Sequence, residues 1–453
     1  MSRPEPPPGP FLVVGLARSG QAAALALRAR GEQVIGLDLG RPDGAQALAD
    51  AGVELHLGGE DWDGAALVGR FASLVKSPGV PADVPAIALG HAAGVPVLGE
   101  LELAWRLLSN AFLAVTGTNG KTTTVELIGH VHRTAGAPVA VAGNVGTALS
   151  SLVGKVDSRA RIVCEASSFQ LEDSLAFAPE VAVLLNVAPD HLDRHGTLAA
   201  YTAAKLRIFA NQRPVDRAIL PVGLDLGPIP GAARQVTFGE GAVADISLSE
   251  GHLCWRGERL IDAADLAIPG RHNLHNAMAA AAACLECGLD LESVRAGLRS
   301  FPGVAHRLEL VAERDGVRYV NDSKATNVAS TLVALDALAP APVERPDAGA
   351  PKRPIHLLLG GQGKGQDFAP LGPAVACSCR AVYLIGEDTP LIAAAIADSG
   401  VPAESCDTLE RAIELARERA RAGEIVLLSP ACASFDQFTD YEDRGERFRG
   451  LVG

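Results

Sequence analysis

Short runs of β-branched and aliphatic residues alternate along this chain with longer amphipathic or alanine-rich segments. Near the N-terminus the apolar run Phe11–Gly15 precedes a helix-like segment, Gln21–Arg30, and a second apolar run, Gln33–Asp38. Later runs with the character of buried strands are Ala111–Thr116, Arg161–Cys164, Val181–Val187, Arg217–Pro221, Val317–Asn321, Ile355–Leu359, Ala381–Ile385 and Ile425–Leu428. This alternation is typical of βαβ units, in which helices cover a mostly parallel sheet. The sequence therefore predicts an α/β protein.

The 453 residues suggest roughly three domains at about 150 residues each. We predict domains at residues 1–100, 101–303 and 304–453. The second boundary follows Phe301–Gly303, where an alanine-rich helical region ends. The proline-rich segment Ala339–Pro354 is predicted to be a surface loop within the last domain, because proline is excluded from helix interiors and central strands.

The composition excludes several classes of protein. With 40 Lys and Arg against 53 Asp and Glu, the net charge of −13 disfavours nucleic-acid and acidic-membrane partners. No apolar run approaches the roughly 20 residues that span a bilayer, and the start MSRPEPPPGP lacks the pattern of a signal peptide. The eight scattered cysteines include two pairs that are close in sequence, Cys284 with Cys287 and Cys377 with Cys379. Neither pair has a second pair of Cys or His at the spacing of a zinc site. We therefore expect a cytoplasmic protein with structural thiols.

The segment Thr116–Thr124, TGTNGKTTT, directly follows an apolar strand. In such a turn the backbone N–H groups cradle an anion, and the positive end of the following helix faces the same point. Lys121 can reach the terminal phosphates, and a hydroxyl at Thr122 is expected to ligate Mg²⁺. Val115 stands where the common form of this motif has its first glycine. The segment predicts a nucleotide site formed by Gly117, Thr118, Asn119, Gly120, Lys121, Thr122 and Thr123.

Polar residues follow two neighbouring strands. Glu165 ends one strand, and Asp190 and His191 follow another in the segment NVAPDHLDRH. Such residues cluster at the mouth of an α/β sheet, where ligands bind. Taken singly each is commonly a capping or solvated residue, but behind a phosphate loop they favour a metal–triphosphate centre.

Near the N-terminus, Gly15–Gly20 resembles G-x-G-x-x-G with Ala17 in the middle place, and Asp38 ends the next strand. The pattern indicates that a nucleotide moiety binds here, but it does not indicate NAD in particular. An oxidoreductase function would depend on this segment alone. Tight packing of helix on strand accounts for Gly20 equally well.

Eight segments together carry a family resemblance: TGTNGKTTT, EASSFQLE, NVAPDHLDRH, YTAAKLRIF, HNLHNAMAA, NDSKATN, GGQGKGQDF and SPACASFDQFTDYEDRGERF. In this order the chain resembles the Mur ligases, and NDSKATN and SPACASFDQF most resemble the glutamate-adding members. The resemblance runs through all three sections. It implies a Rossmann-like N-terminal domain, a central parallel sheet of the phosphate-loop ATPase type and a Rossmann-like C-terminal domain.

The implied activity is ATP-dependent amide ligation in peptidoglycan precursor synthesis. The carboxylate of UDP-N-acetylmuramoyl-L-alanine attacks the γ-phosphate of ATP, and the amino group of D-glutamate then attacks the acyl phosphate. Phosphate is a good leaving group from an acyl phosphate, whereas the oxide ion that would have to leave a free carboxylate is a very poor one. Catalysis is therefore mainly positioning and charge neutralisation. The resemblance implies ATP and two Mg²⁺ ions as cofactors, no nucleic-acid partner, no membrane insertion and a monomer.

The resemblance also implies roles for single residues. Lys121, Glu165, His191 and Lys205 form the catalytic group, with Thr122, Glu165, His191 and Lys205 at the two metal ions. Lys205 is expected to carry a carbamate from CO₂, because an ammonium cannot hold Mg²⁺. The remaining assignments are Asn273, Asn276, Arg307 and Asp322 for ATP; Ser19, Asp38, Gly79, Asn144, Ser167 and His191 for the UDP-substrate; and Lys324, Thr326, Lys364, Ser434, Phe435 and Tyr441 for glutamate.

One departure from the family pattern lies near the uracil end, where the residues after Asp38 read Leu-Gly-Arg, so that the expected arginine is shifted to Arg41. The alternatives to a D-glutamate ligase are a related ligase adding another amino acid, L-glutamate included, a folylpolyglutamate synthase-like enzyme, and a phosphate-loop ATPase that drives a partner.

Overall fold

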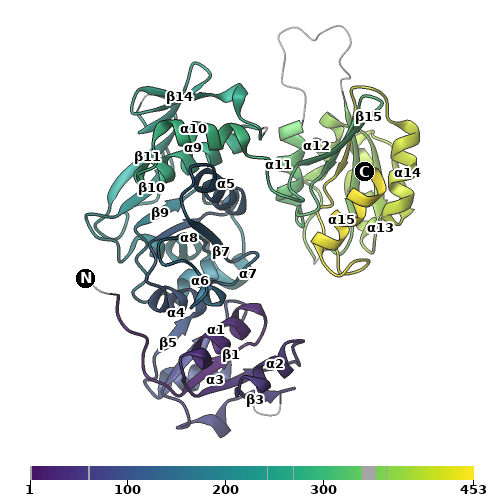
Figure 1. Ribbon diagram of the computed structural model, residues 1–453. Coiled ribbons are helices and arrows are strands. Elements are labelled where there is room, and N and C mark those ends of the chain that lie inside the picture. Colours follow the sequence, from purple (N-terminus) through teal and green to yellow (C-terminus); the bar gives the residue numbers. More distant parts are fainter. Residues whose placement is uncertain (1–2, 60–61, 242, 269, 339–352, 364) are drawn as a thin grey trace. The chain divides into compact units, whose positions relative to one another are not determined.

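The computed structural model describes residues 3–59, 62–241, 243–268, 270–338, 353–363 and 365–453. The described residues form three sheets of five, nine and six strands, each associated with helices (Figure 1). The predicted α/β class is confirmed. By contacts the chain divides into two compact units. Unit 1 comprises residues 1–267 and 273–301 and holds the first two sheets, and unit 2 comprises residues 268–272 and 302–453.

The first sheet has the strand order β3-β2-β1-β4-β5, with all neighbours parallel. The order reverses between β1 and β4, which is where nucleotides bind in open sheets of this kind. Its elements are β1 (Phe11–Val14), α1 (Arg18–Ala29), β2 (Val34–Asp38), α2 (Ala45–Asp50), β3 (Glu54–Leu57), β4 (Ser73–Lys76), α3 (Pro85–Ala92), β5 (Val97–Gly99) and α4 (Glu100–Leu107).

The central sheet has the order β14-β13-β12-β11-β10-β9-β6-β8-β7 and is parallel from β7 to β12. Its strands are β6 (Phe112–Thr116), β7 (Val139–Gly143), β8 (Arg161–Glu165), β9 (Val181–Leu184), β10 (Arg217–Pro221), β11 (Arg234–Glu240), β12 (Ile246–Ser249), β13 (His252–Trp255) and β14 (Glu258–Asp262). Its helices are α5 (Lys121–Thr134), α6 (Ser168–Glu172), α7 (Leu192–His195), α8 (Leu198–Leu206), α9 (Arg271–Glu286) and α10 (Leu291–Ser300).

Two features of the central sheet differ from the expected elements. The run expected to be a strand to Val187 ends at Leu184, because Asn186 turns to the phosphate loop and accepts a hydrogen bond from the Asn119 backbone N–H. The antiparallel extension β12–β14 was not predicted, since its strands are four or five residues long and only partly buried.

Unit 2 contains the sheet β15-β16-β20-β17-β18-β19, parallel except for the antiparallel edge pair β15–β16. Its elements are β15 (Glu309–Arg314), β16 (Val317–Asn321), α11 (Val328–Leu338), β17 (Ile355–Gly360), α12 (Leu371–Ser378), β18 (Cys379–Ile385), α13 (Thr389–Ile396), β19 (Ala403–Asp407), α14 (Leu409–Arg419), β20 (Ile425–Leu428) and α15 (Tyr441–Val452). The predicted loop at 339–354 lies almost wholly outside the described residues.

Candidate active site

The phosphate loop leads from β6 into α5, as the motif predicts. Gly120 has a left-handed backbone, with φ 85°, and a Cβ at this position would stand 2.3 Å from Asn276 Oδ1. Only glycine fits, because both the backbone conformation and the space forbid a side chain. Lys121 Nζ donates to the carbonyl oxygens of Gly117 and Thr118, at 2.8 and 2.9 Å. The ammonium therefore lies over the loop, at the start of α5.

Glu165 is the centre of the polar cluster beside this loop. Its buried carboxylate accepts hydrogen bonds from Thr122 Oγ1, at 2.8 Å, and from Asn144 Nδ2, at 3.0 Å. Gly143 brings the neighbouring strand close, since a Cβ there would be 2.3 Å from the Glu165 carbonyl oxygen. The predicted residues Thr122 and Asn144 thus both bind the carboxylate of Glu165, the third predicted residue.

Lys205 lies on α8, and only 1% of its side chain surface is exposed. Its Nζ donates to the Gly117 carbonyl oxygen, at 2.8 Å, and stands 4.3 Å from the centre of the Tyr201 ring. Burial, and then the neighbouring Lys121 ammonium, lower the pKa of Lys205 to about 7. A considerable fraction of the amine is therefore neutral near pH 7.

His191 caps α7 in a left-handed conformation, with φ 51°. About half of its side chain is exposed, and its Nε2 stands 3.6 Å from Asp190 Oδ2. Its ring contacts Phe169, with 4.8 Å between ring centres. Ser167 caps the N-terminus of α6, accepting from the Gln170 backbone N–H in a capping box. The side chain of Ser167 is therefore part of the turn that follows Glu165.

Asn273 and Asn276 lie one turn apart on α9, and both are buried. Asn276 Nδ2 donates to Asn273 Oδ1 at 3.1 Å. The close approach of Asn276 to Gly120 brings this pair to the phosphate loop. The polar positions of an otherwise alanine-rich helix therefore face the site.

A second group of polar residues lies at the carboxyl end of strands β1 and β2 in the first sheet. Asp38 Oδ2 accepts from the Leu16 backbone N–H at 2.5 Å, and Asp38 Oδ1 from Gly40 N–H at 2.8 Å. A Cβ at Gly20 would be 1.8 Å from the Gly15 carbonyl oxygen, so Gly20 is required for close packing of α1. The predicted contacts Ser19 and Gly79, and also Arg41, are partly or fully exposed around this end.

In unit 2, the predicted ATP contact Asp322 follows β16 and is buried. It accepts hydrogen bonds from Ser429 Oγ, at 2.8 Å, and from the Leu308 backbone N–H, at 3.2 Å. Burial raises the pKa of Asp322 to about 7, although Ser429 and the nearby Arg307 oppose the shift. The charge of Arg307 is therefore close enough to Asp322 to favour the ionised carboxylate.

The glutamate assignments come from two segments that Arg444 joins. The Arg444 guanidinium is 1% exposed and donates to Ser323 O and Oγ on one segment and to Cys432 O on the other, at 2.9–3.0 Å. Burial lowers its pKa to about 10. Lys324 and Thr326 follow Ser323, and the buried Ser434 and exposed Phe435 follow Cys432. Lys364 lies outside the described residues.

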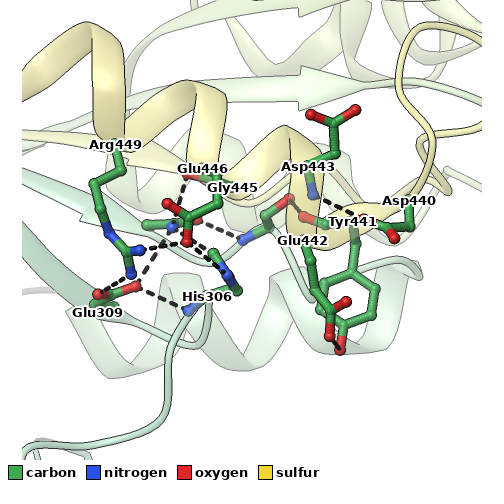
Figure 2. Close-up of polar contacts among 11 residues, drawn as sticks. His306, Glu309, Asp440, Tyr441, Glu442, Asp443, Gly445, Glu446 and Arg449 are labelled. Carbon is green, nitrogen blue, oxygen red and sulfur yellow. Dashed lines mark hydrogen bonds and ion pairs between the residues drawn. The ribbon is translucent and has the colours of Figure 1, made fainter. Parts of the chain in front are cut away.

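Tyr441 begins α15, and its ring centre is 5.5 Å from Lys324 Nζ. Figure 2 shows His306, Glu309, Glu446 and Arg449 pointing toward one another beside it. His306 O accepts from the Lys324 backbone N–H at 3.1 Å, and His306 N–H donates to Glu309 Oε2 at 2.9 Å. This cluster thus supports the loop that carries Arg307.

Sequence reasoning did not assign Arg444 or His306. Arg444 lies in the segment DYEDRGERF, where charges at neighbouring positions make it look like one more solvated residue. Gly445, directly after it, allows the close approach of His306, because a Cβ at Gly445 would stand 2.1 Å from His306 Nδ1.

Five of the eight cysteines are buried, Cys254 and Cys287 are partly buried, and Cys377 is exposed. All eight are free thiols. Burial raises the pKa of Cys284 well above its usual value, and that of Cys287 to about 11, which makes both poor nucleophiles.

The residues around Glu165 suit Mg²⁺. The carboxylate is buried with two neutral hydrogen-bond donors, and Thr122 adds a hydroxyl oxygen, so the donors are hard oxygens. Across the described ranges there is no cluster of three or more His, Cys, Asp and Glu side chains placed to hold a metal ion. Mg²⁺ is commonly bound through one or two carboxylates with substrate phosphates and water, so this set fits.

Three α/β sheets, with a phosphate loop opening a helix of the central sheet, define a phosphate-loop protein with two additional Rossmann-like sheets. Two family models match the chain, "Mur ligase middle domain" at residues 115–284 and "Mur ligase, glutamate ligase domain" at residues 306–432. The chain is 41% identical to a UDP-N-acetylmuramoylalanine–D-glutamate ligase of Pelotomaculum thermopropionicum, covering 97% of this chain and 96% of that protein. A protein of the same name from Anaeromyxobacter dehalogenans is 43% identical, with 100% and 99% covered. The chain belongs to the Mur ligase family.

Solved structures share the fold at lower identity. UDP-N-acetylmuramate-alanine ligase from Thermotoga maritima has a TM-score of 0.61 at 21% identity, covering 97% of this chain and 98% of that one. A D-alanyl-D-alanyl ligase of the family from Acinetobacter baumannii has a TM-score of 0.60 at 18% identity, covering 97% and 92%. None of the helices that the structure describes has the length and apolar character needed to cross a membrane.

Proposed function

We propose that this chain joins D-glutamate to UDP-N-acetylmuramoyl-L-alanine at the expense of ATP, in the synthesis of peptidoglycan precursors. The observation that carries the proposal is identity of about 40% along the whole chain to relatives named for this reaction. The cluster of Lys121, Thr122 and Glu165 at the phosphate loop supports it, because phosphoryl transfer needs these groups together.

In the first step, a carboxylate oxygen of the alanyl group attacks the γ-phosphorus of ATP. The bond from the γ-phosphorus to the bridging oxygen breaks, ADP leaves, and an acyl phosphate forms. Lys121 and the loop N–H groups hold the phosphates, while Asn273 and Asn276 bind toward the nucleoside. Thr122 and Glu165 would hold one Mg²⁺ ion, and His191 and Lys205 would hold a second. Bound there, the ions would supply positive charge that offsets the charge developing on the transferred group.

Lys205 is proposed to act as a carbamate. Its neutral amine attacks CO₂, a C–N bond forms and one proton is released, which gives an anion able to serve the second Mg²⁺. The depressed pKa of Lys205 supports this, because only the unprotonated amine reacts. A carbamate signal from protein kept in ¹³C-bicarbonate, absent in Lys205→Arg, is the expected result.

In the second step, the amino nitrogen of D-glutamate attacks the acyl carbon and loses a proton. The tetrahedral intermediate collapses, the C–O bond to phosphorus-bound oxygen breaks, and inorganic phosphate leaves. Lys324, Thr326, Lys364, Ser434, Phe435 and Tyr441 are proposed to hold the glutamate, with the cation of Lys324 on a carboxylate. Ser19, Asp38, Gly79, Asn144 and Ser167 bind the UDP-substrate, and Arg307 and Asp322 bind ATP.

The test is phosphate release and product mass with UDP-N-acetylmuramoyl-L-alanine, ATP, Mg²⁺ and either D- or L-glutamate. Release is expected only with both substrates present, together with a product heavier by one glutamate residue in the D-glutamate arm. Rapid ATP hydrolysis without either substrate would contradict a ligase, and product in the L-glutamate arm alone would contradict the assigned chirality.

We also infer a cytoplasmic monomer, since ATP and UDP-sugars are cytoplasmic substrates. Size-exclusion chromatography with light scattering is expected to give a mass near 46.8 kDa.

A further inference from the structure

His195, the last residue of α7, has no role in the reaction described above. Its side chain is 2% exposed. The ring stacks on Phe169, with 5.5 Å between ring centres and 14° between planes, and packs against Tyr201 at 5.1 Å. Its place is therefore between the two aromatic rings that flank His191 and Lys205.

Both ring nitrogens of His195 have polar partners. Nδ1 stands 3.1 Å from Glu172 Oε1, and Nε2 stands 3.0 Å from Ser168 Oγ. Burial lowers the pKa of His195, so the ring is neutral near pH 7. The contact of Nε2 with the Ser168 hydroxyl is a hydrogen bond, whereas Nδ1 faces the Glu172 carboxylate in an electrostatic contact without hydrogen-bond geometry.

The partners of His195 belong to the segments that carry the predicted site residues. Tyr201 forms a 3.3 Å hydrogen bond with Thr118 Oγ1 of the phosphate loop, and Lys205 Nζ lies over the Tyr201 ring. Ser168 directly follows the helix cap Ser167. One imidazole thus connects α6, α8 and, through Tyr201, the phosphate loop.

Glu172 extends the same connection to the N-terminal sheet. Its other oxygen stands 3.3 Å from Arg194 Nη2, and Arg194 Nη1 donates to the Pro78 carbonyl oxygen at 3.1 Å. Pro78 precedes Gly79, a proposed contact of the UDP-substrate. The guanidinium also lies over the Phe169 ring, at 4.1 Å.

We propose that His195 is a positioning residue for the metal-binding part of the active site, acting through Ser168 and Tyr201 rather than by touching a substrate. It fixes the start of α6 after Glu165 and the Tyr201 ring against which Lys205 rests. This inference depends on the proposed ligase function. A role in packing alone would need the ring but neither of its polar contacts, and the two roles can be separated by experiment.

His195→Phe keeps an aromatic ring and removes the hydrogen bond to Ser168 together with the contact to Glu172, and Ser168→Ala removes the same hydrogen bond from the opposite side. Groups that orient metal ligands typically change metal affinity or activity about 10- to 100-fold when lost. We therefore expect roughly a tenfold rise in the Mg²⁺ concentration for half-maximal rate, or a similar fall in kcat, in His195→Phe. The KM for D-glutamate should stay within about twofold, because the glutamate assignments lie in unit 2.

The chain offers a matched control in His130→Phe. His130 also bonds a serine hydroxyl, Ser300 Oγ at 2.8 Å, and also contacts a phenylalanine ring, Phe301 at 5.6 Å. It lies on α5 about two and a half turns from Lys121, outside the proposed site. This variant should keep wild-type kcat and Mg²⁺ dependence.

The double variant Ser168→Ala/His195→Phe should be no slower than His195→Phe, because both changes remove the same contact. Wild-type kcat and Mg²⁺ dependence in His195→Phe would overturn the inference, and so would equal losses in every kinetic constant, the KM for D-glutamate included. If His195→Phe does not fold, Ser168→Ala alone decides by the same two measurements. Absence of ligation by the wild-type protein would instead refute the proposed function.

Discussion

At the scale of single residues, the site depends on polar groups held where water is excluded. Glu165, Lys205 and Asp322 are each at least 95% buried, and each has its partners supplied by a different segment. Buried polar groups keep a defined geometry because an unmade hydrogen bond costs more than a made one contributes. Such residues are therefore sensitive to changes of a single atom.

Gly120→Ala tests the steric requirement of the phosphate loop. The substitution adds a Cβ 2.3 Å from Asn276 Oδ1 at a φ of 85°. We expect ADP affinity, measured by calorimetry, to fall roughly 5- to 150-fold, since strain and displacement of Asn276 together cost roughly 1–3 kcal/mol. Gly136→Ala is the control, because Gly136 has φ 68° with open space around its Cβ position. Equal ADP affinity in the two variants would contradict the role of space at Gly120.

Asp322→Asn tests the buried carboxylate by pH. Since the pKa of Asp322 is raised to about 7, the folded protein binds this proton more tightly than the unfolded chain does. The contribution to stability is full below the unfolded pKa of about 4 and is lost as the pH rises through 7. Asparagine cannot ionise. The unfolding free energy of the variant relative to wild type should therefore rise by about 1 kcal/mol or more between pH 5 and 8 in urea titrations. A constant difference would show that Asp322 ionises normally.

At the scale of elements, the strands of the three sheets were largely predictable, whereas their edges were not. Buried central strands such as β6 and β17 are continuous apolar runs, and periodicity finds them directly. Strands β12–β14, at one end of the central sheet, and the edge strand β15 mix exposed and buried positions over short lengths, so they give no clear pattern. Helix α14 ends at Arg419, because Ala420 adopts an extended backbone.

Helix α4 depends on one carboxylate for its attachment to the central sheet. Glu102 is fully buried and accepts hydrogen bonds from the backbone N–H groups of residues 175–177, at 2.8–3.1 Å, while pairing with Arg106. Glu102→Gln should lower the unfolding free energy by about 2 kcal/mol or more, because it leaves Arg106 without its charge partner. Glu126→Gln on the exposed face of α5, where Arg133 is 3.9 Å away, should change it by less than about 0.5 kcal/mol. Equal effects in urea denaturation would refute this account of Glu102.

At the scale of the whole molecule, the motifs indicate candidate site residues but not the residues that support them. The phosphate loop, Glu165 and Lys205 come together as parallel strands require, since the carboxyl ends of such strands share one edge. The supporting residues Arg444, His306 and His195 could not be predicted, because their roles arise from contacts between segments distant in sequence.

Within unit 1, a buried ion pair joins the first sheet to the second. Lys76, at the end of β4, is 1% exposed, and its Nζ stands 2.8 Å from Asp173 Oδ2 at an angle outside the range of a hydrogen bond. Lys76→Met should lower the unfolding free energy by about 3–5 kcal/mol, because it leaves a buried carboxylate without its cation. Lys76→Met/Asp173→Leu should recover part of this loss. A double variant less stable than Lys76→Met, measured by thermal unfolding, would contradict the explanation.

The attachment of Arg444 has a consequence for the evolution of specificity. Arg444 bonds the main-chain carbonyl oxygens of Ser323, Cys432 and Ala433, and it also donates to the Ser323 hydroxyl. Main-chain oxygens are the same whatever residues stand beside them. The side chains at positions 324, 326, 434 and 435 can therefore be exchanged without dismantling the frame that presents them. A selection experiment for a new amino-acid acceptor can vary these four positions freely while holding Ser323 and Arg444 constant.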